Sequence, residues 1–221
     1  MSSAEIIWLR DDPASALDDF ASALDAAEQA TLAGFQHPQR QRSFILSRTL
    51  LRHILAPKLD VAKSTIVFSR RENGRLALAS DSPWQFSLSH AAGLVAVMVA
   101  RADCGVDIEV QRPVPFEKIA RRYFSAAENA WLAQCDAASR EHHFFRLWTL
   151  KEASVKALHE GLANNLSRLA FDVSAEPARL IDPGYGVQVF QQVDAGVYLA
   201  GATVATGPVS WKVCPANVED L

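Results

Sequence analysis

Residues 105–110 read Gly-Val-Asp-Ile-Glu-Val, and this alternation of apolar and acidic side chains predicts a half-buried β-strand. Side chains two residues apart on a strand share a face, so Asp107 and Glu109 are expected to project together, opposite the apolar residues. Two carboxylates placed side by side repel one another, which calls for a cation between them. An exposed strand with a polar face would show the same pattern, so both interpretations stay open here.

On both sides of this strand, helical patterns come first and strand patterns follow. The predicted helices cover residues 13–32, 39–55 (ending before Pro57), a segment that a capping box starts at Ser125, and 141–159 (ending before Gly161). The predicted strands cover residues 6–9, 66–68, 76–78 (after a turn at Asn73-Gly74), 84–89, 94–99, 171–173, 187–190, 198–204 and 210–213. The repeated order predicts an α+β fold with two α+β halves, residues 1–104 and 105–221.

The composition is typical of a folded soluble protein. The 221 residues are 49% hydrophobic and 21% charged, which suits one domain or two small ones at roughly 100–200 residues per domain. Because 25 acidic and 22 basic residues leave a net charge of −3, no basic field favours nucleic acid or membrane as a partner. Cys104, Cys135 and Cys214 form no CxxC pair, so neither a disulfide framework nor a structural zinc site is expected. Since no leader and no run of ~20 apolar residues is present, we expect a cytoplasmic protein.

Residues 147–159 carry a second polar pattern, on a predicted helix. Glu152, Lys156 and His159 follow one another at intervals of four and three residues, which places them on one ridge. Glu152 and Lys156 alone would usually be an ordinary surface ion pair of small effect. The ridge therefore indicates chemistry only in combination with other polar residues.

Two more polar groups precede the strand. His90 ends a predicted strand at a turn of small residues, where a histidine is most often structural or solvated. Arg40, Arg42 and Arg48 lie on one predicted helix, where a solvated surface is an equally good interpretation. Neither group identifies a function by itself.

Taken together, these residues fit the chemistry of phosphate transfer. The carboxylates of Asp107, Glu109 and Glu152, with waters and a phosphate, could complete the octahedral oxygen shell of Mg²⁺. Lys156 and His90, together with the helix arginines, could neutralise a polyphosphate. Few simple binding modules need this combination, whereas phosphate-transfer enzymes do.

At these residues the sequence resembles the 4′-phosphopantetheinyl transferases, specifically their larger, monomeric, surfactin-synthetase-activating type. That family is marked by a Gly-Val/Ile-Asp-Ile/Val-Glu strand, found here at 105–109, and by a Trp/Phe-x-x-Lys-Glu-Ala/Ser-x-x-Lys helix, found here at 148–156. The other matching stretches are Arg48-Thr49-Leu50-Leu51, Ser89-His90 and Phe124-Ser125. The resemblance covers residues 40–161.

The resemblance implies a reaction and an architecture. The reaction is transfer of the phosphopantetheine arm of coenzyme A to a serine of an acyl, aryl or peptidyl carrier protein, with Mg²⁺ as cofactor and release of adenosine 3′,5′-bisphosphate. The implied fold is a pseudo-twofold pair of similar α+β halves with the active site at their interface. The enzyme is expected to be a monomer.

The resemblance also implies roles for single residues. The residues at its metal positions are Asp107, Glu109 and Glu152, of which Glu152 is also the candidate base for the carrier serine. The residues at its phosphate-contact positions are Lys156 and His90, with Ser89 beside them in the turn. The remaining candidates are Lys151 for a charge-stabilising or acid role, Arg48 near the adenosine 3′-phosphate, and Arg40 and Arg42 as helpers.

One departure and one partner surface follow from the resemblance. The family often has Gly-Lys-Pro where this chain has Gly74-Arg75-Leu76, so Arg75 keeps a positive charge for phosphate while the loss of proline frees the turn. Carrier proteins of this kind are acidic helical bundles, which call for a basic or apolar docking face. The candidates for that face are Arg121, Arg122, Tyr123 and Phe124, although core packing explains the two aromatic residues equally well.

Two other functions stay open from the residues alone. A Mg²⁺-dependent nucleotide pyrophosphohydrolase would use water in place of the carrier serine, but no glutamate-rich helix of the Nudix kind is present. A non-catalytic module for binding a carrier or a nucleotide would use the acidic pair structurally. Such a module would bind coenzyme A equally well with and without magnesium.

Overall fold

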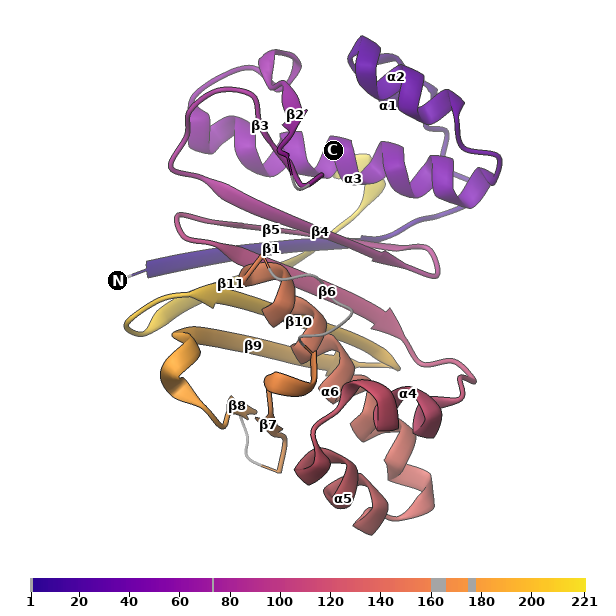
Figure 1. Ribbon diagram of the computed structural model, residues 1–221. Coiled ribbons are helices and arrows are strands. Elements are labelled where there is room, and N and C mark those ends of the chain that lie inside the picture. The colour runs from indigo at the N-terminus through magenta and orange to yellow at the C-terminus, as the bar shows by residue number, and fades with distance from the viewer. Residues whose placement is uncertain (1, 73, 160–165, 175–177) are drawn as a thin grey trace.

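The chain folds into four layers in the computed structural model, which describes residues 2–72, 74–159, 166–174 and 178–221 (Figure 1). Two β-sheets form the inner layers, and one long helix covers the outer face of each. The architecture is therefore the mixed α+β fold that the sequence predicts. Asn73 and Gly161, predicted as a turn residue and a helix stop, lie outside the described residues.

The described residues form six α-helices and four short 3₁₀ turns. The α-helices are α1 (Asp18–Ser22), α2 (Ala26–Ala33), α3 (Pro38–Leu59), α4 (Phe116–Tyr123), α5 (Ala126–Gln134) and α6 (Ala137–Ala157). The 3₁₀ turns are η1 (Lys63–Thr65), η2 (Leu166–Arg168), η3 (Pro183–Tyr185) and η4 (Val218–Asp220). No helix in these ranges is long and apolar enough to span a membrane.

The strands form two larger sheets and two small hairpins. In chain order they are β1 (Ser2–Arg10), β2 (Phe68–Arg70), β3 (Leu76–Leu78), β4 (Gln85–Ala91), β5 (Leu94–Ala100), β6 (Cys104–Val110), β7 (Phe171–Asp172), β8 (Arg179–Leu180), β9 (Val187–Asp194), β10 (Val197–Val204) and β11 (Val209–Ala216). The first sheet has the order β11-β1-β5-β4 and the second β6-β10-β9, while β2 pairs with β3 and β7 with β8. The sequence patterns predict these strands with the exception of β8, although the strand predicted over 66–68 shares only Phe68 with β2.

The last strand of the chain lies in the first sheet. β11 runs parallel to β1, with Val213 opposite Ile6, whereas β5 runs antiparallel on the other side of β1, with Met98 opposite Ile6. The C-terminal strand thus crosses the division that the sequence predicts at residue 104. The two-half division and the pseudo-twofold relation stay proposals.

Three apolar clusters hold the layers together. One lies between α3 and the first sheet, and includes Leu51 and Val97. A second lies between the two sheets and includes Met98 and Val106, and a third lies under α6 and includes Tyr198. Because apolar burial is the main favourable term in folding, these clusters fix α6 and β6 with respect to β4.

Several predicted helix boundaries are wrong. The first helix begins at Asp18 and not at Pro13, and the helix predicted from residue 141 begins at Ala137. The helix expected over 13–32 is divided into α1 and α2, because Asp25 accepts a 2.8 Å hydrogen bond from the Glu28 backbone N–H and so starts a new helix. The helix expected to end before Pro57 continues to Leu59 and contains that proline in its last turn. The capping box at Ser125 is confirmed at the start of α5.

Candidate active site

Strands β4 and β6 lie side by side where the two sheets meet. The Ser87 hydroxyl oxygen in β4 accepts a 3.1 Å hydrogen bond from the backbone N–H of Val106 in β6. Two residues further along β4, the Ser89 hydroxyl donates a 2.8 Å hydrogen bond to Asp107 Oδ1. Residues two apart share a face of a strand, so both serines face β6 and tie it to the first sheet.

Helix α6 packs directly on β6 because Gly105 has no side chain. A Cβ at this position would lie 1.9 Å from the carbonyl oxygen of Ala153 and 2.6 Å from the backbone nitrogen of Ala157. Asp107 and Glu109 share the face of Gly105, since they follow it by two and four residues. The glycine at the start of the predicted motif thus brings both carboxylates under α6.

Lys156 on α6 contacts the centre of this arrangement. Its Nζ lies 2.8 Å from Asp107 Oδ1, and it also donates to the Val106 carbonyl at 3.0 Å and to the Ser89 hydroxyl at 3.4 Å. The side chain of Lys156 is 27% exposed, whereas that of Asp107 is only 7% exposed. An ammonium group therefore stands beside a buried carboxylate and is still open to solvent.

Glu152 lies one helical turn before Lys156 and faces the same carboxylates. Burial and, less strongly, the negative charges of Asp107 and Glu109 raise the pKa of Glu152 to about 7, although the positive charge of Lys156 opposes this shift. A carboxyl group with this pKa can hold or release a proton at neutral pH. The same repulsion among carboxylates would be relieved by a cation placed between them.

The donor chemistry here suits a divalent cation. Asp107 Oδ2 is buried and has no hydrogen-bond partner within the described residues, so one oxygen is available for a ligand. Carboxylate oxygens are the donors that Mg²⁺ prefers. In the described ranges, however, no three His, Cys, Asp or Glu side chains are arranged as a metal-binding group. Asp107 is paired with Lys156 instead, and Glu109 Oε2 lies 2.5 Å from Arg112 Nη1.

Arg40 and His90 line one pocket at the start of α3. The pocket has a volume of about 430 Å³ and is also lined by His37 and Ser43. Partial desolvation lowers the pKa of His90, and the positive charges of Lys156 and Arg40 lower it further. An anion bound in this pocket would meet Arg40, the ring of His90 and the positive end of the dipole of a 22-residue helix.

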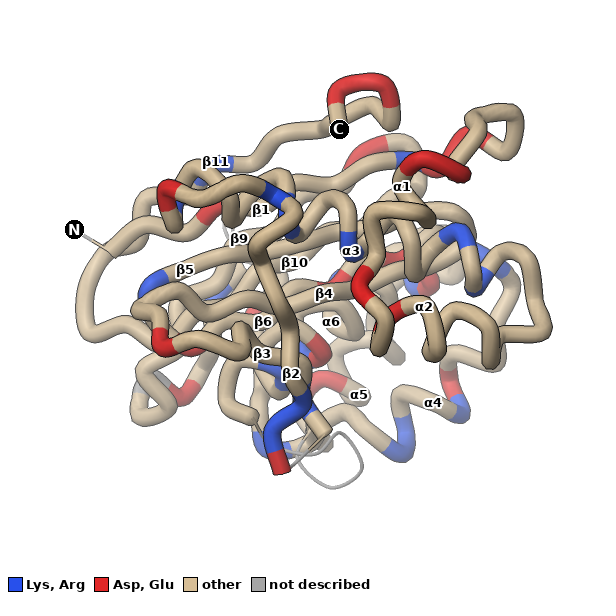
Figure 2. Tube along the Cα trace, turned by 90° about the horizontal axis from the view of Figure 1, so that it is seen from above, with Lys and Arg blue, Asp and Glu red and all other residues tan. Residues whose placement is uncertain are grey.

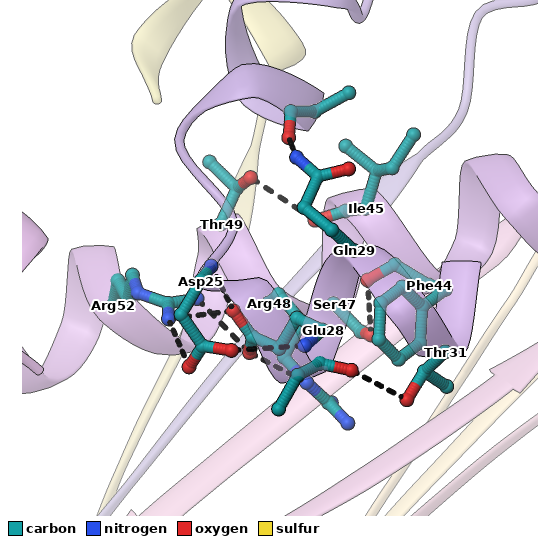
Figure 3. A network of polar contacts seen from close by, with 12 residues as sticks. Asp25, Glu28, Gln29, Thr31, Phe44, Ile45, Ser47, Arg48, Thr49 and Arg52 are labelled. Atoms are coloured by element: carbon teal, nitrogen blue, oxygen red, sulfur yellow. Dashed lines mark hydrogen bonds and ion pairs between the residues drawn. The ribbon is translucent and has the colours of Figure 1, made fainter. Parts of the chain in front are cut away.

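Arg48 lies deeper along α3, in a network that Figure 3 shows from close by. Its Nε lies 3.1 Å from Glu28 Oε1, and the other oxygen of this glutamate is 2.7 Å from Arg52 Nη2. Burial and, less strongly, the positive charges of Arg70 and Arg52 lower the pKa of Arg48 to about 10, although the negative charge of Glu28 opposes this shift. Within the described part of the chain, the Nε of Arg48 faces the Glu28 carboxylate without forming a hydrogen bond, and its contact with a phosphate stays a prediction.

Two predicted site residues, Arg42 and Lys151, make contacts that connect elements of the fold. Arg42 donates to both carboxylate oxygens of Asp11, which ties α3 to the end of β1, and it is not among the residues that line the Arg40 pocket. Lys151 is fully buried, 2.8 Å from Glu128 Oε2, and donates to the carbonyls of Leu166 and Leu169. Both side chains are engaged in holding elements together, so neither is given a role in the mechanism proposed below.

Arg75 lies between the two long-range neighbours Asp103 and His159. Its Nη1 is 2.7 Å from Nδ1 and 2.6 Å from Nε2 of the His159 ring, and 3.9 Å from Asp103 Oδ1. Its Nη2 donates a 3.1 Å hydrogen bond to the carbonyl of Phe86 in β4. Along β4, Phe86 therefore contacts Arg75, and Ser89 contacts both Asp107 and Lys156. His90 follows and lines the same pocket as Arg40.

Comparison with known proteins identifies the family to which this arrangement belongs. Residues 12–102 match the family described as 4′-phosphopantetheinyl transferase, N-terminal, and residues 103–200 match the 4′-phosphopantetheinyl transferase superfamily. The 4′-phosphopantetheinyl transferase HetI from Nostoc sp. is 34% identical over 177 residues, which cover 77% of this chain and 74% of that relative. The chain belongs to the 4′-phosphopantetheinyl transferase superfamily.

Other phosphopantetheinyl transferases are similar to this chain over shorter stretches. The transferase psf-1 from Bacillus pumilus is 33% identical over 135 residues, 61% of this chain and 58% of psf-1. The transferase Sfp from Bacillus subtilis is 28% identical over 144 residues, 65% of this chain and 64% of Sfp. The chain is therefore a transferase that moves the 4′-phosphopantetheine of coenzyme A to carrier proteins, as the resemblance implied.

Several residues of this transferase that shape the site were not found from the sequence. A sequence pattern points to Ser87, because this residue precedes Ser89 by two positions and so shares its strand face. A sequence pattern also points to Asp25 and Glu28, which are the two ends of a capping box. No sequence pattern points to Asp103 or Arg112, because their partners are set by how the loops at the two ends of β6 come to lie.

Proposed function

We propose that transfer is Mg²⁺-dependent, and that Asp107, Glu109 and Glu152 hold the ion at a site between two pseudo-twofold α+β halves, 1–104 and 105–221. The observation that carries this proposal is the orphaned Oδ2 of Asp107. It lies in a buried carboxylate that faces Glu152, whose pKa is raised to about 7 in part by the charges of Asp107 and Glu109. Removing this repulsion is what a divalent cation does.

An ion held by these carboxylates would withdraw charge from the pyrophosphate of coenzyme A. The chain itself supplies further positive charge, since Lys156 Nζ is 27% exposed beside Asp107 and can contact a phosphate oxygen. Charge that grows on the leaving phosphate oxygen is stabilised by such a group, which is often worth a few kcal/mol of barrier.

Glu152 is our proposed base. The carrier serine hydroxyl attacks the β-phosphorus, the bond from this phosphorus to the bridging oxygen breaks, and adenosine 3′,5′-bisphosphate leaves with that oxygen. The serine proton passes to the Glu152 carboxylate. A base is most efficient when its pKa lies near the working pH. The pKa of about 7 belongs to Glu152 without a bound ion, and a cation on this carboxylate would lower it.

The remaining phosphate of coenzyme A is assigned to the first half. Arg40 and His90 share the pocket at the start of α3, where a helix N-terminus favours an anion. Arg48, which is ion-paired with Glu28, and Ser89, which already contacts Asp107 and Lys156, complete the proposed coenzyme contacts. Arg75 contributes a further positive charge from the loop before β3.

Magnesium removal is expected to abolish transfer. An apo carrier protein incubated with the enzyme, coenzyme A and Mg²⁺ should gain the mass of phosphopantetheine, and an excess of chelator should reduce this labelling at least about a hundredfold. Mass spectrometry of the intact carrier measures the effect. Readdition of Mg²⁺ in excess over the chelator, which should restore labelling, is the control.

The same experiment separates the other functions. Magnesium-dependent breakdown of coenzyme A without carrier labelling would support a pyrophosphohydrolase. Binding of coenzyme A that is equal with and without magnesium, with neither labelling nor breakdown, would support a binding module. Full labelling in the presence of chelator would contradict the metal assignment and leave the transferase activity intact.

The face of α4 is the proposed docking surface for an acidic helical carrier protein. Figure 2 shows basic segments along α4 at the edge of the molecule. Arg121 lines a pocket of about 440 Å³ with Phe116 and Arg140, and the Arg122 guanidinium lies 5.2 Å from the ring centre of Tyr123. Phe124 is 4% exposed and stacks on Phe144, so it is a core residue and not part of this surface.

Arg122→Glu is expected to weaken carrier use and to leave coenzyme binding unchanged. Reversing one rim charge against an acidic partner should raise the KM for the carrier about fivefold or more, mostly at low salt. Arg179→Glu is the matched control, because Arg179 is 73% exposed in β8, on the other side of α5. If the affinity for coenzyme A fell by the same factor as carrier use, the docking assignment would be wrong.

Two further properties complete the proposal. We propose that the enzyme acts as a monomer, as the family resemblance implies. We also propose a cytoplasmic location. The three cysteines are free, which suits a reducing compartment.

A further inference from the structure

A histidine occupies a backbone position that favours glycine, directly after α6. The helix ends at Ala157 with Leu158 as C-cap, and His159 follows with φ of 57°. Helices commonly end in this left-handed conformation, which glycine adopts without strain and other residues adopt at a cost. A histidine kept here needs a compensating contact from its side chain.

The side chain of His159 makes that contact with two segments far away in the sequence. Its Nε2 lies 2.6 Å from Asp103 Oδ1, in the loop between β5 and β6. Both ring nitrogens lie within 2.7 Å of Arg75 Nη1, and Arg75 Nη2 is held by the Phe86 carbonyl of β4. The guanidinium of Arg75 is thus fixed from three elements, β4, the β5–β6 loop and the end of α6.

The hairpin that carries Arg75 needs such anchors. Among the residues that the structure describes, strands β2 and β3 pair only with each other, through three residue pairs, and a two-stranded hairpin of this size is marginal by itself. Phe68 at its start packs edge-on against Phe86 at 5.6 Å, which fixes one end. The contacts of Arg75 with His159 and Asp103 fix the other end.

The same helix terminus presents Lys156 to the active site. Lys156 lies three residues before His159, and its Nζ is 2.8 Å from Asp107 Oδ1. One rigid element therefore sets the position of two cations from different halves of the chain, Lys156 directly and Arg75 through His159. Their separation is fixed before any substrate binds.

We propose that His159 and Asp103 are positioning residues that hold the Arg75 guanidinium in place to bind a phosphate group of coenzyme A. This inference rests on the proposed function, in which Arg75 is a coenzyme contact. An arginine ordered in advance loses less side-chain entropy on binding, which is worth about a three- to tenfold gain in affinity. The effect should therefore fall on coenzyme binding and not on the chemical step.

His159→Gly tests the proposal, because glycine keeps the left-handed backbone while removing the ring. We expect the KM for coenzyme A and its calorimetric Kd to rise about three- to tenfold, with kcat and the carrier KM within about twofold. The melting temperature should change little, because relief of the backbone strain offsets the lost contacts of the ring with Arg75 and Asp103. His159→Asn, which also tolerates this backbone and can donate to Asp103, should give an intermediate KM.

A double-mutant cycle ties the effect to Arg75. In an Arg75→Ala background, His159→Gly should cause no further change in coenzyme affinity, because the group it positions is gone. Independent effects in the two backgrounds, an unchanged KM for coenzyme A, or a lower kcat with unchanged KM would each overturn the proposal. A wild-type enzyme that labels no carrier, but whose coenzyme Kd still depends on His159 through Arg75, would overturn the proposed function and leave this inference standing.

Discussion

A Gly105→Ala variant is expected to lose most of its folding stability, and transfer activity with it. The new Cβ would lie 1.9 Å from the carbonyl oxygen of Ala153, 2.6 Å from the nitrogen of Ala157 and 2.8 Å from the Cβ of Lys156. Backbone atoms in the middle of a helix cannot rotate away, so α6 must move off β6. We expect the free energy of unfolding to fall by about 3 kcal/mol or more, at the upper end of overpacking effects.

Two other glycines give matched controls for this variant. At Gly201 a Cβ would meet side-chain ends that can shift, Ile6 Cδ1 at 2.6 Å and Trp211 Cζ3 at 2.9 Å, so Gly201→Ala should have an intermediate effect. At Gly207 a Cβ would meet nothing within 4 Å, so Gly207→Ala should be nearly neutral. Thermal unfolding and carrier labelling measure the series. A Gly105→Ala protein with wild-type melting temperature and activity would show that α6 does not depend on this close approach.

The sequence predicts those features that depend on neighbours along the chain. Alternation in 105–110 predicts that Asp107 and Glu109 share a face, and both do lie on the face of β6 that Gly105 opens to α6. The three-residue step from Ser125 to Glu128 predicts the start of α5. Such patterns involve a few adjacent residues, so their geometry is fixed by the backbone alone.

Features that depend on the packing of distant segments are not predicted. Nothing in the sequence places β11 beside β1, because parallel pairing of the two chain ends leaves no local signal. The helical pattern predicts Arg42 as a solvated surface residue, whereas in the structure it binds Asp11, which is 31 positions away in the sequence. The metal assignment has the same limit, because the relative placement of Glu152 and the strand carboxylates depends on how α6 sits on β6.

Lys151 and Lys156 show that helical spacing predicts the face on which a side chain lies and not its contacts. Glu152, Lys156 and His159 fall on one ridge, and Lys151 lies about 100° around the helix from Glu152. The family motif contains both lysines and does not separate their roles. The structure does: Lys156 is 27% exposed and contacts Asp107, whereas Lys151 is fully buried against Glu128.

Replacing Lys156 with methionine is expected to remove activity and to leave the fold largely intact. Methionine keeps the apolar stem, and Ser89 still donates to Asp107, so the melting temperature should fall by no more than about 4 °C, as for a loss of about 1 kcal/mol in a chain of this size. Loss of the ammonium group from the phosphate site should lower kcat about a hundred- to a thousandfold. Carrier labelling and thermal unfolding of the same preparation measure both effects.

Lys151→Met is expected to lower the stability of the fold strongly and to leave kcat nearly unchanged, the reverse of Lys156→Met. This change leaves the Glu128 carboxylate without its cation and two buried carbonyls without a donor, which should cost about 3–5 kcal/mol, or about 10 °C in melting temperature. Adding Glu128→Gln should recover part of this loss, because glutamine keeps the helix cap and carries no charge. Any folded fraction of Lys151→Met should transfer phosphopantetheine at close to the normal kcat. A stable Lys151→Met protein with a kcat as low as that of Lys156→Met would restore Lys151 to the catalytic group, and would show that burial in this helix does not separate structural from chemical roles.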